Sequence, residues 1–209
     1  VSPAKFIPIA EDTRLIVPIG EWALRRACDE AAHWPGHVKV AVNVSAEQML
    51  DANFASTVVS ALAASGLAPE RLELEVTESI FLRDGGAAQS TLNQIQSLGC
   101  KLALDDFGTG YSSLGYLRNN RFNTIKIDRS FVTGAAKDSP ESLAIIRAVV
   151  AMCDALGMET TAEGVESERE LERIRQLGCS KIQGFLFGRP MGALEANALL
   201  DQRAERRIA

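Results

Sequence analysis

The feature that most restricts the fold is a unit that recurs along the chain: a helix ending at a glycine, then a short apolar strand. Glycine is the usual residue at a left-handed helix C-cap. The sequence Leu-Gly-Cys at 98–100 also recurs at 177–179. Helices that alternate with short apolar strands indicate a parallel sheet with helices outside it.

We predict the following elements from hydrophobic spacing and from glycine and proline positions. Helices are expected at 2–11, 15–33, 54–65, 87–98, 142–156 and 168–177. Strands are expected at 38–42, 72–76, 100–104, 124–127, 158–162 and 179–182.

Two architectures fit this alternation, an open doubly wound sheet and a (β/α) barrel. A dinucleotide-binding open sheet should carry G-x-G-x-x-G, whereas Gly108-x-Gly110 lacks the third glycine. Polar residues at the ends of nearly every strand favour a TIM-like barrel, whose active site lies at that face. We therefore predict one domain over 1–209, an incomplete α/β barrel of about six strands, with the first two expected before Val1.

Composition excludes some classes of function. The net charge is −5, so no DNA or RNA partner is expected. The four cysteines form no C-x-x-C pair and are interpreted as reduced core residues of a cytoplasmic protein. His33 and His37 are expected at the surface, and no apolar stretch is long enough for a membrane span.

Oxygen-bearing side chains cluster at the predicted strand ends: Asn43, Glu75, Asp105, Asp106 and Glu163. An all-oxygen set favours Mg²⁺ or Mn²⁺ over Zn²⁺. Adjacent aspartates in a strand point to opposite sides, so Asp105 and Asp106 can share a site only if the chain bends there. We expect nearby glycines to permit that bend. In the alternative interpretation, Lys126 neutralises these acids in a structural ion pair.

Seven short segments occur in order along the chain: 6–11 (FIPIAE), 41–45 (AVNVS), 74–78 (LEVTE), 105–114 (DDFGTGYSSL), 125–131 (IKIDRSF), 162–166 (AEGVE) and 183–190 (QGFLFGRP). Together they resemble the EAL domains, a family whose members open cyclic di-GMP to linear pGpG. The resemblance covers almost the whole chain in order. It implies a metal-dependent phosphodiesterase that acts on cyclic di-GMP.

The resemblance also implies residue roles. One Mg²⁺ or Mn²⁺ ion would be held by Asn43, Glu75 and Asp105, and a second by Asp105, Asp106 and Glu163. The catalytic residues would be Lys126, Glu163 and Glu166, with Gln183, Asn43 and Asp128 at the substrate. Glu78 would brace the loop that contains Phe107, Gly108, Thr109 and Gly110.

The sequence departs from the family in one respect: it lacks the Glu-Ala-Leu motif, which carries a metal-binding glutamate. We expect that motif upstream of Val1, in a parent protein with sensory or diguanylate-cyclase-like domains and possible membrane attachment. The family also implies a homodimer through a surface at 111–117. The activity of the 209-residue chain stays open, and the alternative function is a catalytically inactive cyclic di-GMP receptor.

Overall fold

The computed structural model describes residues 1–108, 117 and 121–206. The strand pairs β1–β2, β3–β4, β4–β5 and β5–β6 are parallel, and the strand order follows the order of the chain from β1 to β6. The predicted alternation of helices with parallel strands is confirmed. Contacts divide the chain into two compact units, Val1–Leu102 with Gly192–Ala209, and Ala103–Met191.

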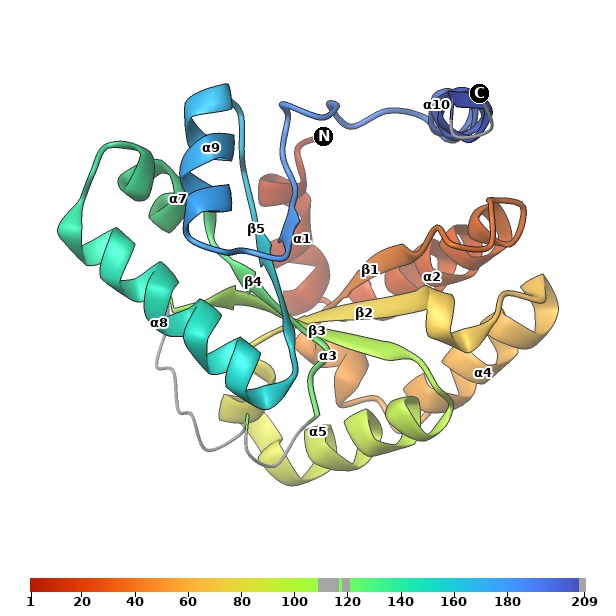
Figure 1. Cartoon of the computed structure of the whole chain (residues 1–209). Helices are drawn as coiled ribbons and strands as arrows, with labels where there is room; N and C mark the ends of the chain where they lie inside the picture. Colours follow the sequence, from red (N-terminus) through yellow and green to blue (C-terminus); the bar gives the residue numbers. More distant parts are fainter. Residues whose placement is uncertain (109–116, 118–120, 207–209) are drawn as a thin grey trace. The chain divides into compact units, whose positions relative to one another are not determined.

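Unit 1 contains two paired strands and most of the helices (Figure 1). Its strands are β1 (Val40–Val44) and β2 (Leu72–Thr77). Its helices are α1 (Pro3–Asp12), α2 (Ile16–Ala32), α3 (Ala46–Met49), α4 (Phe54–Ser65), the 3-10 turn η1 (Pro69–Arg71), α5 (Ile80–Ser97) and α10 (Ala193–Arg206).

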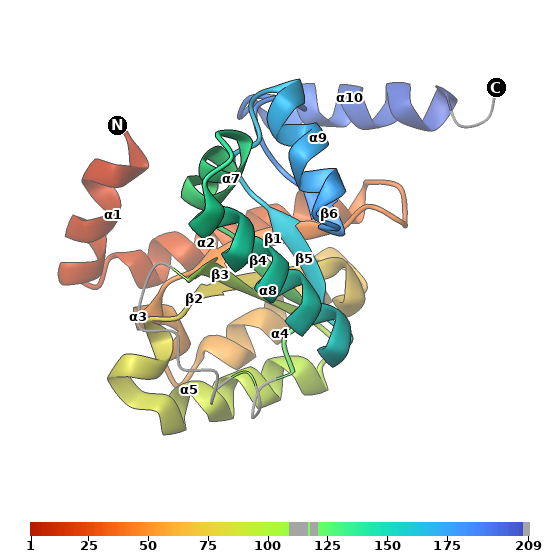
Figure 2. The same ribbon diagram turned by 60° about the vertical axis from the view of Figure 1, so that its left-hand side comes forward.

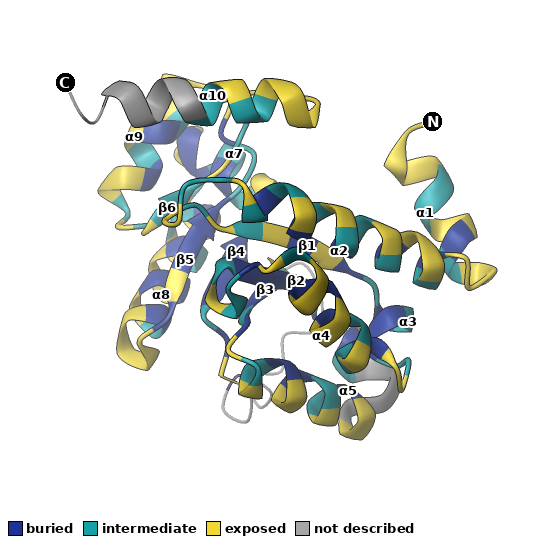
Figure 3. Ribbon diagram, turned by 90° about the vertical axis from the view of Figure 1, so that its right-hand side faces the viewer, coloured by how far each residue is buried: buried dark blue, intermediate teal, exposed yellow. Residues whose placement is uncertain are grey.

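Helix α2 organises the packing of unit 1, since it contacts β1, α3 and α4. Its buried residues, Ile16, Gly20, Leu24, Cys28 and Ala31, form one stripe at helical spacing. The opposite face is exposed, as the alternating colours along α2 show (Figure 3). Gly20 lies against the amide of Gln48 on α3, where a methyl group at position 20 would come within 2.1 Å of Gln48 Nε2.

Arg71 fastens the end of α2 to the start of β2. Its guanidinium donates hydrogen bonds to the carbonyl oxygens of Ala31 (2.7 Å), Val38 (2.9 Å), Trp34 (3.3 Å) and Pro35 (3.4 Å). The last carbonyls of a helix lack partners within the helix, and an arginine can satisfy several of them. One side chain thus orders the turn that leads into β1.

Unit 2 contains α7 (Arg129–Ala136), α8 (Pro140–Leu156) and α9 (Glu168–Gln176). Its strands are β4 (Thr124–Ile127), β5 (Glu159–Ala162), β6 (Lys181–Ile182) and the part of β3 (Lys101–Phe107) that begins at Ala103. Helix α8 contacts β5, and α7 contacts both α8 and α9 (Figure 2). Ile125 and Ile127 of β4 are at most 1% exposed, so the strand lies inside the core.

Several predicted boundaries were wrong. Strand β1 runs from Val40 to Val44 rather than over 38–42. Helix α5 begins at Ile80 rather than at residue 87, so it includes Gly85 and Gly86, although each glycine disfavours a helix by about 1 kcal/mol. We also failed to predict α3, η1, α7 and α10, most of which are short or follow a strand directly.

The predictions of surface histidines and of core positions for three of the four cysteines are confirmed. His33 and His37 are exposed. All four cysteines are free, and three of them are buried, with Cys179 half-buried. Burial raises the pKa of Cys28, Cys100 and Cys179 to about 11 and that of Cys153 to about 12, so they stay protonated near neutral pH. No helix in the described part of the chain has the length and apolar character needed to span a membrane.

Candidate metal centre

Three carboxylates converge in unit 2. Asp105, Asp106 and Glu163 each offer an oxygen, and these atoms lie within 4.8 Å of one another. No other such group of three occurs among the residues whose placement the structure describes. The structure therefore brings together three of the five residues predicted as metal ligands.

Lys126 lies among these carboxylates. Its Nζ is 2.7 Å from Glu163 Oε1 and 3.1 Å from Asp105 Oδ2. The Lys126 side chain is 4% exposed, while those of Asp105 and Glu163 are 13% and 19% exposed. A buried ammonium offsets the repulsion between the two carboxylates, and low solvent access strengthens the attraction.

Strand β3 changes course at the aspartate pair, as predicted, although the bend is not at a glycine. The pairing of β3 with β4 shifts register between Leu104 and Phe107. Asp106 itself adopts a left-handed conformation, φ 54°, and its N–H donates to Asp105 Oδ1 at 3.0 Å. Aspartate tolerates this region better than most residues. The bend lets neighbouring carboxylates serve one site.

Backbone hydrogen bonds fix the position of Glu163. Its N–H donates to the carbonyl of Ile127 (3.0 Å), which continues the β4–β5 pairing one residue past β5. The next turn is joined to the segment after β6, since Val165 N–H donates to Gln183 O (3.1 Å). Gly184 packs so tightly here that a Cβ would lie 2.1 Å from Val165 O.

In unit 1, Asn43 and Glu75 are direct neighbours. They are paired in the register of β1 and β2, so their side chains share one face of this strand pair. Glu75 is 7% exposed and Asn43 is exposed. Both lie inside their strands, as do Asp105, Asp106 and Lys126 in theirs. Glu75 and Lys126 were predicted inside strands 72–76 and 124–127, whereas Asn43, Asp105 and Asp106 were expected just after theirs. Strand β1 is shifted by two residues from the prediction, and β3 is longer because its pairing with β4 continues to Phe107.

The other predicted residues occupy varied positions. The carboxylate of Asp128 caps α7 and accepts hydrogen bonds from the N–H and hydroxyl of Ser130, at 2.9 and 2.5 Å. Gln183 is exposed, and Glu78 is 9% exposed. Phe107 is buried at the end of β3, and Gly108 has φ 90°. Thr109, Gly110 and residues 111–116 of the predicted dimer surface at 111–117 lie outside the described residues, and Leu117 is buried.

Sequence reasoning missed Arg129. Its guanidinium pairs with Glu166 Oε2 at 2.9 Å, beside the turn that begins at Glu163. The available signal was its place next to Asp128 in the segment Ile125-Lys-Ile-Asp-Arg-Ser-Phe131, where we considered only the lysine and the aspartate.

The chemistry of this cluster fits a hard divalent cation. Its donors are carboxylate oxygens, which Mg²⁺ and Mn²⁺ prefer. Asp105, Asp106 and Glu163 would hold one such ion.

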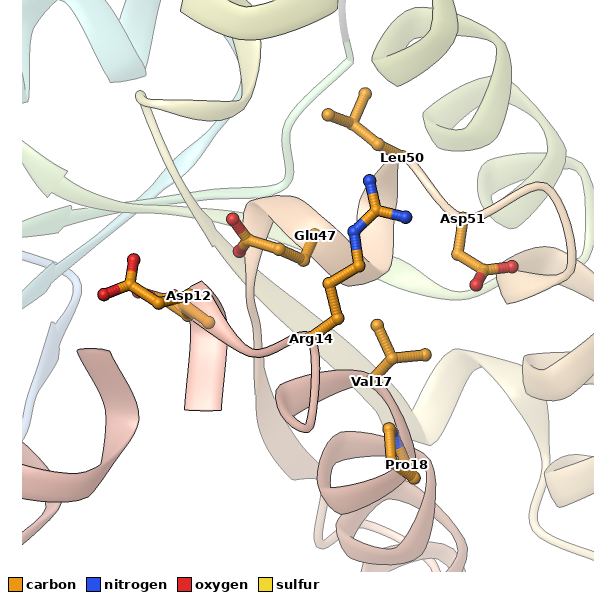
Figure 4. A pocket seen from close by; sticks show the side chains of 8 residues that line it. Asp12, Arg14, Val17, Pro18, Glu47, Leu50 and Asp51 are labelled. Carbon is orange, nitrogen blue, oxygen red and sulfur yellow. The ribbon is translucent and has the colours of Figure 1, made fainter. Parts of the chain in front are cut away.

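A separate hollow of about 610 Å³ lies in unit 1, between the α1–α2 turn and α3 (Figure 4). Its lining includes Asp12, Glu47 and Asp51, together with Arg14, which reaches into it. These carboxylates do not converge at ligand distance within the described chain. The hollow therefore does not compete with the first cluster as a metal centre.

Comparison with known proteins identifies the family. The EAL-domain profile matches residues 1–190. The chain belongs to the EAL-domain family. It is 45% identical over 197 residues to the bifunctional diguanylate cyclase/cyclic di-GMP phosphodiesterase MucR of Pseudomonas aeruginosa, covering 92% of this chain and 29% of MucR. It is 52% identical over 205 residues to the uncharacterized protein y4lL of Sinorhizobium fredii, covering 98% of the chain and 25% of y4lL. The chain thus spans less than a third of either relative.

Solved EAL structures share the fold. The MucR phosphodiesterase in complex with c-di-GMP matches with a TM-score of 0.88 and 44% identity, covering 94% of this chain and 81% of that one. A manganese/cyclic di-GMP complex of Klebsiella pneumoniae BlrP1 matches with a TM-score of 0.78 and 30% identity, covering 90% of this chain and 48% of that one. The predicted relationship to EAL domains and the TIM-like α/β fold of six parallel strands are confirmed.

Proposed function

We propose that the protein containing this EAL domain hydrolyses cyclic di-GMP to linear pGpG with two divalent ions, Mg²⁺ or Mn²⁺. The observation that carries the proposal is the convergence of Asp105, Asp106 and Glu163 around Lys126 in a chain of this family. The phosphodiesterase name of MucR and the manganese in the BlrP1 complex support it.

When bound, divalent ions would polarise the phosphoryl group and lower the pKa of the attacking water. Asp105, Asp106 and Glu163 would hold one ion, and Asn43 and Glu75 stay predicted ligands of the other. Lys126, already beside two of the carboxylates, orients the water and stabilises negative charge on the phosphoryl oxygens. A water oxygen bonds to phosphorus, the ester bond to one ribose breaks, and the released ribose oxygen takes a proton.

The deciding experiment incubates the full-length protein with cyclic di-GMP and Mn²⁺ or Mg²⁺ and separates the nucleotides chromatographically. We expect pGpG from the wild type and a loss of at least about 100-fold in rate for Asp106→Asn, since a ligand is removed. Asp138→Asn, which alters an exposed acid on the surface of unit 2, is the matched control. A wild-type protein that produces no pGpG with either metal would exclude the proposal.

The second candidate is a receptor that binds cyclic di-GMP without cleaving it, because a related EAL domain is known in complex with this nucleotide. Calorimetry distinguishes the two functions: nucleotide binding without pGpG formation by the full-length protein supports the receptor.

We further propose that upstream sensory or diguanylate-cyclase-like domains and a homodimer regulate the site. Light scattering of the full-length protein tests the dimer, and a monomer at micromolar concentration would contradict it.

A further inference from the structure

Arg129 lies directly opposite the turn that begins at the candidate ligand Glu163. It is the first residue of α7, two residues after Ile127, whose carbonyl accepts the Glu163 N–H. Extending the parallel pairing of β4 and β5 places Arg129 level with Gly164. The arginine is therefore positioned by the strand that also carries Lys126.

The hydrocarbon part of Arg129 covers Gly164. A Cβ at position 164 would lie 2.4 Å from Arg129 Cγ, 2.6 Å from Cβ and 2.7 Å from Cδ. Gly164 also has φ 66°, a left-handed conformation that favours glycine. Residue 164 therefore favours glycine for two reasons: the arginine stem leaves no space for a side chain, and the backbone angle is left-handed.

The charged end of Arg129 holds the far side of the same turn. Its guanidinium pairs with Glu166 Oε2 at 2.9 Å. Beyond Glu166, the N–H groups of Glu166 and Ser167 both donate to Glu170 Oε2, at 2.8 and 2.9 Å. The turn is therefore fixed at its start by β4, across its middle by Arg129, and at its end by α9.

The Arg129–Glu166 pair has little value for stability alone. The two side chains are 57% and 37% exposed, and such surface pairs contribute about 0.2–1 kcal/mol. Its geometry matters more, because a turn that starts at Glu163 determines where the Glu163 carboxylate is held. That carboxylate must stay within reach of Asp105 and Asp106 to share an ion.

We propose that Arg129 is a positioning residue for Glu163: its stem covers Gly164, its guanidinium holds Glu166, and the turn between them keeps the Glu163 carboxylate directed at the metal centre. This inference rests on the proposed function, because it assumes that Glu163 binds a divalent ion.

A role for Arg129 through its charge alone predicts the opposite change in cation affinity from a positioning role, so the direction of the change distinguishes the two. Removing a positive charge near a cation site should strengthen cation binding if Arg129 acts only through its charge. Loss of positioning should weaken it, since residues that orient metal ligands typically contribute about 10–100-fold to affinity.

The test measures Mn²⁺ affinity of the full-length protein by isothermal titration calorimetry. Arg129→Met keeps most of the stem and removes the charge, Arg129→Gln is a second neutral variant, and Arg129→Lys keeps stem and charge. The matched control is Arg169→Met, which removes another exposed arginine from an ion pair with Asp138 in unit 2. Circular dichroism verifies folding.

We expect Arg129→Met and Arg129→Gln to bind Mn²⁺ about 10-fold more weakly or worse, with Arg129→Lys close to wild type and Arg169→Met unchanged. In turnover assays, the apparent KM for Mn²⁺ should rise while kcat recovers at saturating Mn²⁺. If the neutral variants bind Mn²⁺ as well as wild type or better, the positioning role of Arg129 is wrong, while the proposed function still stands. A wild-type protein that binds no Mn²⁺ would overturn both this inference and the proposed function.

Discussion

At the scale of single residues, Lys126 is the group that offsets the charge of the carboxylate cluster. Its ammonium contacts Asp105 and Glu163 from a position that is 4% exposed. We predict that Lys126→Met lowers the free energy of unfolding by about 3 kcal/mol in the absence of added metal. Removing the ammonium leaves the carboxylates of Asp105 and Glu163 without their compensating charge. Urea unfolding followed by circular dichroism measures the change.

The control for this variant is Lys181→Met, which breaks the Lys181–Glu159 pair between side chains that are 37% and 50% exposed. It should change stability by no more than about 0.5 kcal/mol. Mn²⁺ should restore more stability to Lys126→Met than to wild type, because the ion replaces the missing positive charge. Equal stability of the two lysine variants would contradict this account.

Arg14 is a residue whose backbone does not suit its side chain. It has φ 58°, a region that costs a residue with a Cβ about 1–2 kcal/mol. We predict that Arg14→Gly is more stable than Arg14→Ala by about 1 kcal/mol, because both remove the side chain but only glycine relieves the backbone. Fluorescence of Trp22 and Trp34, both in unit 1, reports the urea midpoints. Identical midpoints would show that position 14 carries no strain.

At the scale of elements, the contact between α2 and α3 depends on the absence of a side chain at Gly20. A Cβ there would lie 2.1–2.4 Å from the amide of Gln48, which is 3% exposed. Gln48 cannot move freely, because its Oε1 accepts the Ser45 N–H (3.2 Å) in the capping box of α3. Movement of Gln48 would break this cap.

We predict that Gly20→Ala destabilises unit 1 by about 1 kcal/mol, although alanine is normally favoured over glycine in a helix by a similar amount. The control is Gly36→Ala, where nothing lies within 4 Å of an added Cβ. That variant should be neutral or slightly stabilising. Thermal unfolding by circular dichroism compares them, and a stabilised Gly20→Ala would refute the steric argument.

Helix α9 should give stability a defined pH dependence through Glu170. Burial raises the pKa of Glu170, but hydrogen bonds from Glu166 and Ser167 and the charge of Arg129 outweigh it, so the pKa lies below 4.5. A lowered folded-state pKa stabilises the protein above the unfolded value and loses that effect as pH falls through the folded value.

Glu170→Gln should therefore be less stable than wild type at pH 7, and the difference should shrink as pH falls below about 4.5. Glu168→Gln removes a charge from the same first helical turn without touching the capping box, so its effect should be smaller. Urea midpoints between pH 3 and 7 provide the measurement. A difference that is constant across this range would contradict the assignment.

At the scale of the whole molecule, metal binding and folding should be linked. An ion that binds only the folded chain stabilises it by about 2.7 kcal/mol at 100 times its Kd. We predict that Mn²⁺ raises the thermal unfolding midpoint and that Asp106→Asn removes most of the shift. Asp12→Asn, in the hollow of Figure 4, is the control and should retain it. A shift that survives Asp106→Asn would place the ion elsewhere.

The sequence alone was sufficient for the order and type of most elements. Glycine caps and apolar spacing predicted α4, β4 and the C-terminal end of α8 at the residues where they occur. These signals are local, because a helix cap or a strand pattern involves residues close together in the chain. Family motifs extended the prediction to candidate ligands.

Only the tertiary structure decided how those residues meet. Asp105 and Lys126 come from β3 and β4, and Glu163 directly follows β5, so their distances depend on strand register, which no local pattern determines. The packing of the Arg129 stem on Gly164 likewise depends on a contact between segments far apart in the chain. The sequence by itself determined which side chains were available for a metal centre; packing of the strands and turns determined which of them converge and what holds them there.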